Sequence, residues 1–193
     1  RACMSLWSAQ DAALATGGKT AGKWQAAGVS IDTRTLRAGD LFVALADQRD
    51  GHDFVADALQ KGASAALVSR RPADVLSDEN LLYVQDVQIA LEGLARAARQ
   101  RSAAQVIAIT GSAGKTSTKE MLAAILRAQM ETLHSEASFN NDVGVPSTLM
   151  SIELRHRAVV LELGTNHPGE LAPLVKMAAP QFGLLTGIGR EHL

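Results

Sequence analysis

A glycine-rich loop joins an apolar stretch to an amphipathic stretch in the second half of the chain. The loop reads GSAGKTS at 111–117, after the apolar run at 106–109, and it precedes a segment at 121–126 whose apolar residues recur at helical spacing. This order predicts a β-strand, a tight loop and an α-helix. Backbone N–H groups at the helix start and the helix dipole then point at one spot, which suits a phosphate group.

Each residue type in the loop suits a nucleotide. Gly111 and Gly114 allow a tight turn, Lys115 can reach the terminal phosphates, and the Thr116 hydroxyl can ligate magnesium. The spacing is shorter than GxxxxGK[ST], because Ile109 stands where that pattern has its first glycine. A nucleotide site and a plain glycine turn therefore both stay open. The nucleotide reading places the ligand against Gly111, Ser112, Ala113, Gly114, Lys115, Thr116 and Ser117.

The stretch AVVLELGTNHPGEL at 158–171 carries a second candidate. Its apolar first half predicts a buried parallel strand, and Glu162 falls at the strand end, beside the predicted phosphate loop. A carboxylate there can hold the magnesium ion of a bound nucleotide, because hard cations take oxygen ligands. The alternative is an acid at a strand end that meets solvent, and the upstream GSAGKT favours the metal role.

Polar residues in SFNNDVGVPSTLM, between these two stretches, are weaker candidates. Asn140 and Asn141 can donate amide hydrogen bonds to phosphate or substrate oxygens, and Asp142 can cap a following helix. Asn, Asp and Gly are also ordinary turn residues, so an ordinary turn is the alternative. His192 follows a strand end and could face the same cleft, whereas His156 lies between two arginines and is expected at the surface.

Bulk properties restrict the partners. The 193 residues are 47% hydrophobic and carry a net charge of -1, so the chain suits one or two globular domains and has no global field for nucleic acid or an anionic membrane. The single cysteine, Cys3, excludes an internal disulfide and fits a reducing compartment. No apolar stretch resembles a signal peptide or a membrane span. We expect a cytoplasmic monomer that binds small molecules.

Strands and helices are predicted to alternate in an α/β fold with parallel sheets. The polar stretch near 100–104 predicts a boundary between domains at 1–102 and 103–193, and the second GKT, in GGKTAGK at 17–23, is predicted as a surface loop. The last strand ends close to residue 193, so we expect the second domain to be truncated. Strands are predicted at 29–31, 41–45, 65–68, 81–84, 132–134, 158–163 and 182–188.

Five motifs in order resemble those of the Mur ligases of bacterial peptidoglycan synthesis, whose phosphate loop has the short form seen here as TGSAGKTS. The other four are DTRTLRAGDLFVAL at 32–45, GHDF at 51–54, FNNDVGVPSTL at 139–149 and ELGTNHPGEL at 162–171. The resemblance covers nearly the whole chain. Within the family, these motifs look most like those of the members that add D-alanyl-D-alanine.

The resemblance implies a role for each matching position. The small N-terminal domain would hold the UDP end of a sugar-peptide substrate, and the second domain would bind ATP. Lys115 would bind the β and γ phosphates, Thr116 and Glu162 would ligate Mg2+, and His192 would help to hold a second Mg2+. Asn140 and Asn141 would lie near the γ-phosphate and the substrate carboxylate. The residues implied at the uridine diphosphate are Ser30, Asp32, Thr33 and Arg34.

The implied reaction adds D-alanyl-D-alanine to UDP-N-acetylmuramoyl-tripeptide through an acyl phosphate. A carboxylate attacks phosphoanions poorly, so positive charge from Lys115 and Mg2+ must neutralise the transferring group. Family members continue beyond His192 with a carbamylated lysine and a third domain, so this fragment alone is expected to be inactive. Another Mur-type ligase, of the diaminopimelate-adding or folylpolyglutamate kind, and a non-catalytic nucleotide-dependent binding module are the alternatives.

Overall fold

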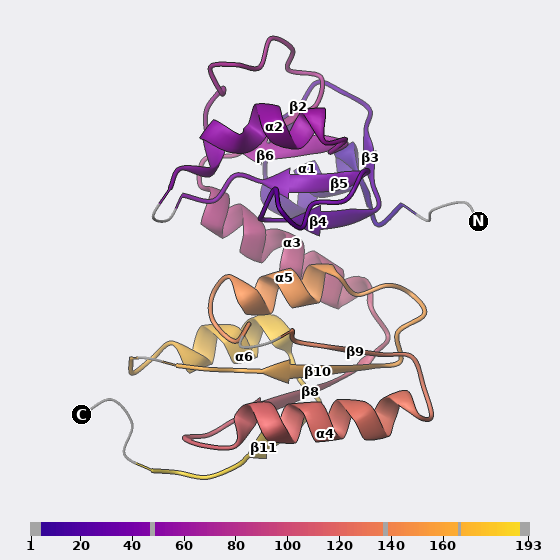
Figure 1. Ribbon diagram of the computed structural model, residues 1–193, viewed down its shortest axis with the longest axis vertical. Helices are drawn as coiled ribbons and strands as arrows, with labels where there is room; N and C mark the ends of the chain where they lie inside the picture. The colour runs from indigo at the N-terminus through magenta and orange to yellow at the C-terminus, as the bar shows by residue number, and fades with distance from the viewer. Residues whose placement is uncertain (1–4, 47–48, 137–138, 166, 190–193) are drawn as a thin grey trace. The chain divides into compact units, whose positions relative to one another are not determined.

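The chain forms two compact units. The computed structural model describes residues 5–46, 49–136, 139–165 and 167–189, and its contacts separate Arg1–Leu94 from Ala95–Leu193 (Figure 1). Both units mix helices with mainly parallel sheets, which confirms the predicted α/β class. The division falls within helix α3 (Val87–Arg101), N-terminal to the predicted boundary at 102. Among the described residues, no helix combines the length and apolar character that a membrane crossing requires.

The first unit is built on a sheet of five strands in the order β2-β7-β6-β5-β4. Neighbours from β4 to β7 pair in parallel, whereas β2 pairs antiparallel with β7. The prediction that 17–23 is only a surface loop was wrong in part, because β2 lies inside it; two residues at a sheet edge show no hydrophobic period. The strands are β2 (Lys19–Thr20), β4 (Gly28–Ser30), β5 (Asp40–Val43), β6 (Ala65–Val68) and β7 (Leu81–Tyr83).

Helix α1 (Ala9–Thr16) is capped at both ends by residues suited to those positions. The hydroxyl of Ser8 accepts a hydrogen bond from the Asp11 N–H at 3.1 Å, and Gly17 closes the helix with a φ of 66°. Two short strands that flank α1 and β2, β1 (Trp7–Ser8) and β3 (Gln25–Ala26), pair antiparallel and were not predicted. A 3-10 turn η1 (Gly51–Phe54) leads into α2 (Val55–Gln60), which packs on the apolar core of this sheet.

The second unit contains a parallel sheet in the order β11-β8-β10-β9. Helix α4 covers one face, and α5 and α6 lie on the other (Figure 1). Connections from the neighbouring strands β8 and β10 therefore leave on opposite faces, an arrangement that in open α/β sheets places the ligand site at the carboxyl ends of the two strands. The elements are β8 (Gln105–Thr110), α4 (Lys115–Arg127), β9 (Thr132–His134), α5 (Gly144–Met150), β10 (Ala158–Glu162), α6 (Leu171–Ala178) and β11 (Phe182–Leu185).

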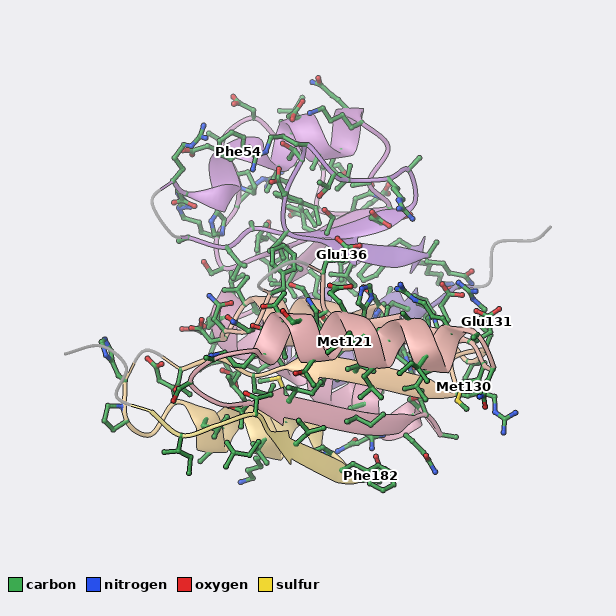
Figure 2. The ribbon with its side chains drawn as sticks, turned by 60° about the horizontal axis from the view of Figure 1, so that its bottom comes forward. Phe54, Met121, Met130, Glu131, Glu136 and Phe182 are labelled. Carbon is green, nitrogen blue, oxygen red and sulfur yellow. The ribbon has the colours of Figure 1, made fainter. Side chains whose placement is uncertain are left out.

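The inward face of α4 differs from the predicted one. The predicted face consists of Met121, Leu122, Ile125 and Leu126. Leu122 and Leu126 pack against the core, but Met121 is 61% and Ile125 63% exposed. The buried positions on the same side are Lys119 and Ala123, so a lysine occupies a place where the apolar pattern was expected. Figure 2 shows Met121 on α4, and it also shows Phe182, which is exposed on the edge strand β11.

Candidate phosphate and metal site

The glycine loop joins the end of β8 to the start of α4, as predicted. Gly111 has a φ of 134°, and a Cβ at this position would lie 2.4 Å from Oγ1 of Thr186. Gly114 precedes the first residue of α4 with a φ of 81° and has open space around the position of a Cβ. Both backbone conformations favour glycine, and at Gly111 the packing requires it as well. The loop therefore leaves the first N–H groups of α4 at the carboxyl edge of the sheet.

The segment after β11 holds this loop in place. The Ser112 N–H donates to the Gly187 carbonyl at 3.0 Å, and the Gly189 N–H donates to the Ser112 hydroxyl at 2.7 Å. The Thr186 hydroxyl donates to the Ala113 carbonyl at 2.6 Å. Sequence analysis missed these contacts, because nothing in the residues at 186–189 points to a partner more than 70 positions away.

Glu162 lies at the centre of the site, at the end of β10. It is buried, with 1% exposure, so the alternative of an acid that meets solvent was wrong. Its Oε2 accepts a hydrogen bond from the Thr116 hydroxyl at 2.9 Å, and its Oε1 accepts one from Nδ2 of Asn140 at 2.9 Å. The Glu162 N–H donates to the hydroxyl of Ser135, a buried residue that was not predicted to belong to the site, at 3.2 Å. The carboxylate is thus held in one orientation.

The oxygen donors of Thr116 and Glu162 fit a magnesium ion shared with a nucleotide. Magnesium prefers oxygen ligands and often takes only one or two from the protein, with phosphates and water supplying the others. Residues 5–46, 49–136, 139–165 and 167–189 contain no group of three or more His, Cys, Asp or Glu side chains able to hold a metal. The Thr116 hydroxyl and the Glu162 carboxylate therefore suit an ion that the protein shares with nucleotide phosphates, rather than one coordinated by protein side chains alone. His192, predicted at a second magnesium, lies outside the described residues.

The Lys115 side chain folds back over the loop, where its Nζ donates to the Gly111 carbonyl. Its ammonium group therefore lies against the backbone of the glycine loop. The neighbouring Thr116 and Ser117 are exposed at the start of α4. The predicted phosphate contacts thus come together on one loop and one helix start.

The two asparagines have different partners. Asn140 reaches Glu162, and its carbonyl accepts from the Gly164 N–H at 2.8 Å. Oδ1 of Asn141 instead accepts from the Gly144 N–H at 2.9 Å, at the start of α5. Asn141 therefore caps this helix, a role predicted for Asp142. A residue two or three positions before the bonded N–H groups fits this cap geometry better than the adjacent one.

Lys119 is a further member of the site that sequence analysis missed. Its side chain is fully buried, and Nζ lies 3.1 Å from Oε1 of Glu120 and 3.9 Å from Oε2 of Glu162. Glu120 in turn lies 3.3 Å from Nε2 of His134. Burial, together with the charge of Arg127, lowers the pKa of His134. The available signal was spacing, since Lys119 follows Lys115 by one helical turn.

The four residues predicted at the uridine diphosphate lie together in the first unit, at the last position of β4 and in the turn that follows it. The Asp32 carboxylate pairs with the Arg34 guanidinium at 2.6 Å, and hydrogen bonds from Arg34 lower the pKa of Asp32. The Ser30 hydroxyl donates to the Asp32 carbonyl, and the Thr33 carbonyl accepts from Nζ of Lys61 at 3.2 Å. A cavity of about 340 Å³ in the same unit is lined by other residues, namely His52, Asp53, Ala56, Arg70, Arg71, Pro72, Ala73 and Asp74.

His156 differs from its predicted place. It is 9% exposed, so the expectation of a surface side chain was wrong. Its Nδ1 accepts a hydrogen bond from the Glu153 N–H at 2.9 Å, which requires that nitrogen to be unprotonated. Burial, and then the neighbouring Arg155, lower its pKa.

Comparisons with known proteins show the family to which the chain belongs. Residues 25–133 match the description "Mur ligase family, catalytic domain", and residues 109–193 match "Mur ligase middle domain". The chain is 46% identical over 166 residues to the UDP-N-acetylmuramoyl-tripeptide--D-alanyl-D-alanine ligase of Escherichia coli, covering 86% of this chain and 36% of that protein. It is 35% identical over 188 residues to the ligase of that name from Rickettsia prowazekii, covering 97% and 42%.

Solved structures give the same result. MurF from Acinetobacter baumannii superposes with a TM-score of 0.84 at 36% identity, covering 95% of this chain and 41% of that one. MurF ligase from Thermotoga maritima, solved in complex with ADP, superposes with a TM-score of 0.71 at 30% identity, covering 84% and 38%. The chain thus spans about two fifths of the length of these relatives.

Proposed function

The chain belongs to the Mur ligase family, and from that premise we propose that the full-length protein is an ATP-dependent amide ligase. It adds D-alanyl-D-alanine to UDP-N-acetylmuramoyl-tripeptide during peptidoglycan precursor synthesis in the cytoplasm. The observation that carries the chemistry is the contact of Glu162 with Thr116 beside the glycine loop. The names of the relatives from E. coli and R. prowazekii support the substrates.

ATP phosphates bind against the loop and the first N–H groups of α4. Lys115 exchanges the Gly111 carbonyl for the terminal phosphates, which are stronger acceptors for an ammonium. Thr116 and Glu162 would hold Mg2+, which when bound would neutralise phosphate charge and align the transferring group. His192 would support a second Mg2+.

The terminal carboxylate of the tripeptide attacks the γ-phosphorus and gives an acyl phosphate and ADP. The dipeptide amine then attacks the acyl carbon and releases phosphate. Asn140 fixes the Glu162 carboxylate, and Asn141 offers Nδ2 of its amide to a substrate oxygen while Oδ1 caps α5. No covalent bond to the protein is needed, because positioning and charge stabilisation carry this chemistry.

The uridine diphosphate binds in the domain at 1–102, against Ser30, Asp32, Thr33 and Arg34, and ATP binds in the domain at 103–193. Arg34 is already paired with Asp32, so a diphosphate would share this guanidinium rather than meet a free one. The protein acts as a monomer on these small molecules.

Phosphate release by the full-length protein tests the proposal. The reaction contains ATP, Mg2+, UDP-N-acetylmuramoyl-tripeptide and D-alanyl-D-alanine, each omitted in turn. Lys115→Ala removes the loop ammonium, and Lys176→Ala on the exposed side of α6 is the matched control. We expect release that needs both acceptor substrates and is lost only in the Lys115 variant. Nucleotide binding without substrate-dependent release would reject the ligase, and equal release with a single amino acid would reject the dipeptide specificity.

A further inference from the structure

Lys119 places a buried positive charge next to the proposed magnesium site, and the proposed reaction assigns it no role. The side chain has no exposed surface, although it belongs to a residue type that is rarely buried without a compensating partner. It projects from the inward side of α4, one turn beyond Lys115 and Thr116. Two carboxylates, those of Glu120 and Glu162, share its ammonium.

The two carboxylates differ in distance and in exposure. Glu120 lies at 3.1 Å, within hydrogen-bond distance, but 51% of its side chain is exposed. Glu162 lies at 3.9 Å and its side chain is 2% exposed. At 3.9 Å the ammonium makes no hydrogen bond to Oε2. It attracts the carboxylate by charge alone, and the lone pairs of Oε2 stay available to the Thr116 hydroxyl and to a cation.

We propose that Lys119 is a positioning residue for the magnesium site: its ammonium fixes the Glu162 carboxylate in the orientation that presents Oε2 to the metal. This inference rests on the proposed function only in that a magnesium nucleotide binds at the loop. Without Lys119, the buried Glu162 carboxylate would lose a compensating positive charge. It would then turn toward another cation, and the nearby candidate is Lys115, whose ammonium group is needed to bind ATP. Lys119 thus leaves the Glu162 carboxylate available to the metal and the Lys115 ammonium group available to the phosphates.

Two effects of Lys119 on the metal oppose each other. Its charge repels Mg2+ directly, whereas its hold on Glu162 favours Mg2+ binding. The orientation effect should dominate, because Oε2 would bind the metal directly, whereas the ammonium lies 3.9 Å from that oxygen and would not touch the metal's ligand shell through a bond of its own. Removing residues that orient a metal ligand typically lowers metal affinity by about 10–100-fold. The sign of the change therefore separates the two effects.

The competing explanation is that Lys119 only anchors Glu120 and, through it, His134. Glu120→Gln tests this, because it removes the nearer carboxylate charge and leaves Glu162 in place. A role in the Glu120 contact would make Lys119→Met and Glu120→Gln behave alike. A role at the metal would make them differ.

The experiment measures ADP binding to the full-length protein by calorimetry over a range of Mg2+ concentrations, for the wild type, Lys119→Met and Glu120→Gln. We expect Lys119→Met to raise the half-saturating Mg2+ concentration about 10–100-fold, with ADP binding in the absence of Mg2+ within about twofold of the wild type. Glu120→Gln should leave the Mg2+ requirement within about twofold. Thermal unfolding shows whether each variant is folded, and Lys119→Gln replaces Lys119→Met if the latter is not.

An unchanged or lower Mg2+ requirement in the Lys119 variant would overturn the inference, and so would an equal rise in Glu120→Gln. The readout is separate from ligation. If the wild-type protein binds ADP with Mg2+ but releases no substrate-dependent phosphate, the proposed function is rejected. The Mg2+ titration of the Lys119 variant then still decides the role of Lys119. Wild-type protein that binds no ADP rejects the magnesium-nucleotide site and Lys119 with it.

Discussion

Glu162 accepts a hydrogen bond from Thr116 across 46 positions of sequence, and this contact ties the end of β10 to the first turn of α4. Asn140 binds the other oxygen of the same carboxylate. Thr116 and Asn140 therefore hold the Glu162 carboxylate from two sides, and variants of the residues that support these contacts should weaken the site to different extents.

Gly164→Ala should damage the site through Asn140. A Cβ at Gly164 would lie 2.6 Å from Cγ of Asn140, so the amide must move away from Glu162. We expect phosphate release by the full-length protein to fall roughly tenfold or more, and unfolding free energy to fall by about 1–3 kcal/mol. Gly183→Ala is the control, because the position of its Cβ is open. Equal rates for the two variants would show that Asn140 has no influence on the site.

The two loop glycines should not respond equally to alanine. Both have positive φ, so each substitution strains the backbone by about 1–3 kcal/mol. At Gly111 the new Cβ also meets Thr186 and the Gly187 backbone, and such overpacking costs about 1–3 kcal/mol more. Gly111→Ala should therefore bind ADP roughly tenfold more weakly than Gly114→Ala. Binding titrations of both variants check this order. A reversed order would contradict the conclusion that the segment after β11 holds the glycine loop in place.

Thr186→Val should loosen the loop without disturbing the fold. It removes the hydroxyl that donates to the Ala113 carbonyl, a bond worth about 0.5–1.5 kcal/mol. ADP affinity should drop roughly two- to tenfold. Thr132→Val removes a comparable bond to the Met130 carbonyl, away from the loop, and should leave ADP affinity unchanged. If both variants bind ADP as the wild type does, the segment after β11 does not support the site.

Burial of His156 should make the protein sensitive to mild acid. Because burial lowers the pKa of His156 in the folded state, the unfolded chain takes up a proton first, near the unperturbed pKa of about 6.5. The contribution of neutral His156 to the free energy of unfolding is then fully present above that pH. It is lost as the pH falls from the unfolded-state pKa toward the lower folded-state pKa. His156→Asn should weaken this fall in unfolding free energy between about pH 7.5 and 5.5. Urea titrations at both pH values check it, and an identical fall in the variant would exclude His156 as a source.

The main features of the site were predictable because they are local. A strand, a glycine loop and a helix leave clear periodicity, and an acid at the end of an apolar run marks Glu162. The hydrogen bond from Thr186 to the glycine loop was not predictable, since the hydroxyl and the Ala113 carbonyl meet only through the pairing of β11 with β8. Lys119 was hidden for another reason: a charged residue on a helix is expected in solvent, and only the packed structure shows it buried.

Smaller errors have similar causes. Strands β1, β2 and β3 have two residues each, too few to show alternation. Asn141 and Asp142 are both good cap residues, and the turn geometry that selects Asn141 is not encoded in residue type. His156 lies between arginines, which suggested solvent, but the backbone turn at Glu153 gives its ring a partner.

Helix α3 crosses the division between the two units, and this has a consequence for proteolysis. A protease binds its substrate in an extended form, which a hydrogen-bonded helix does not offer. The loop between β6 and β7 is more accessible, with Leu76 at 93% exposure. Brief digestion by a protease of broad specificity should therefore cut inside the first unit, near residue 76, and not between the units. The larger product would begin before β7 and would keep α3 together with the whole phosphate loop.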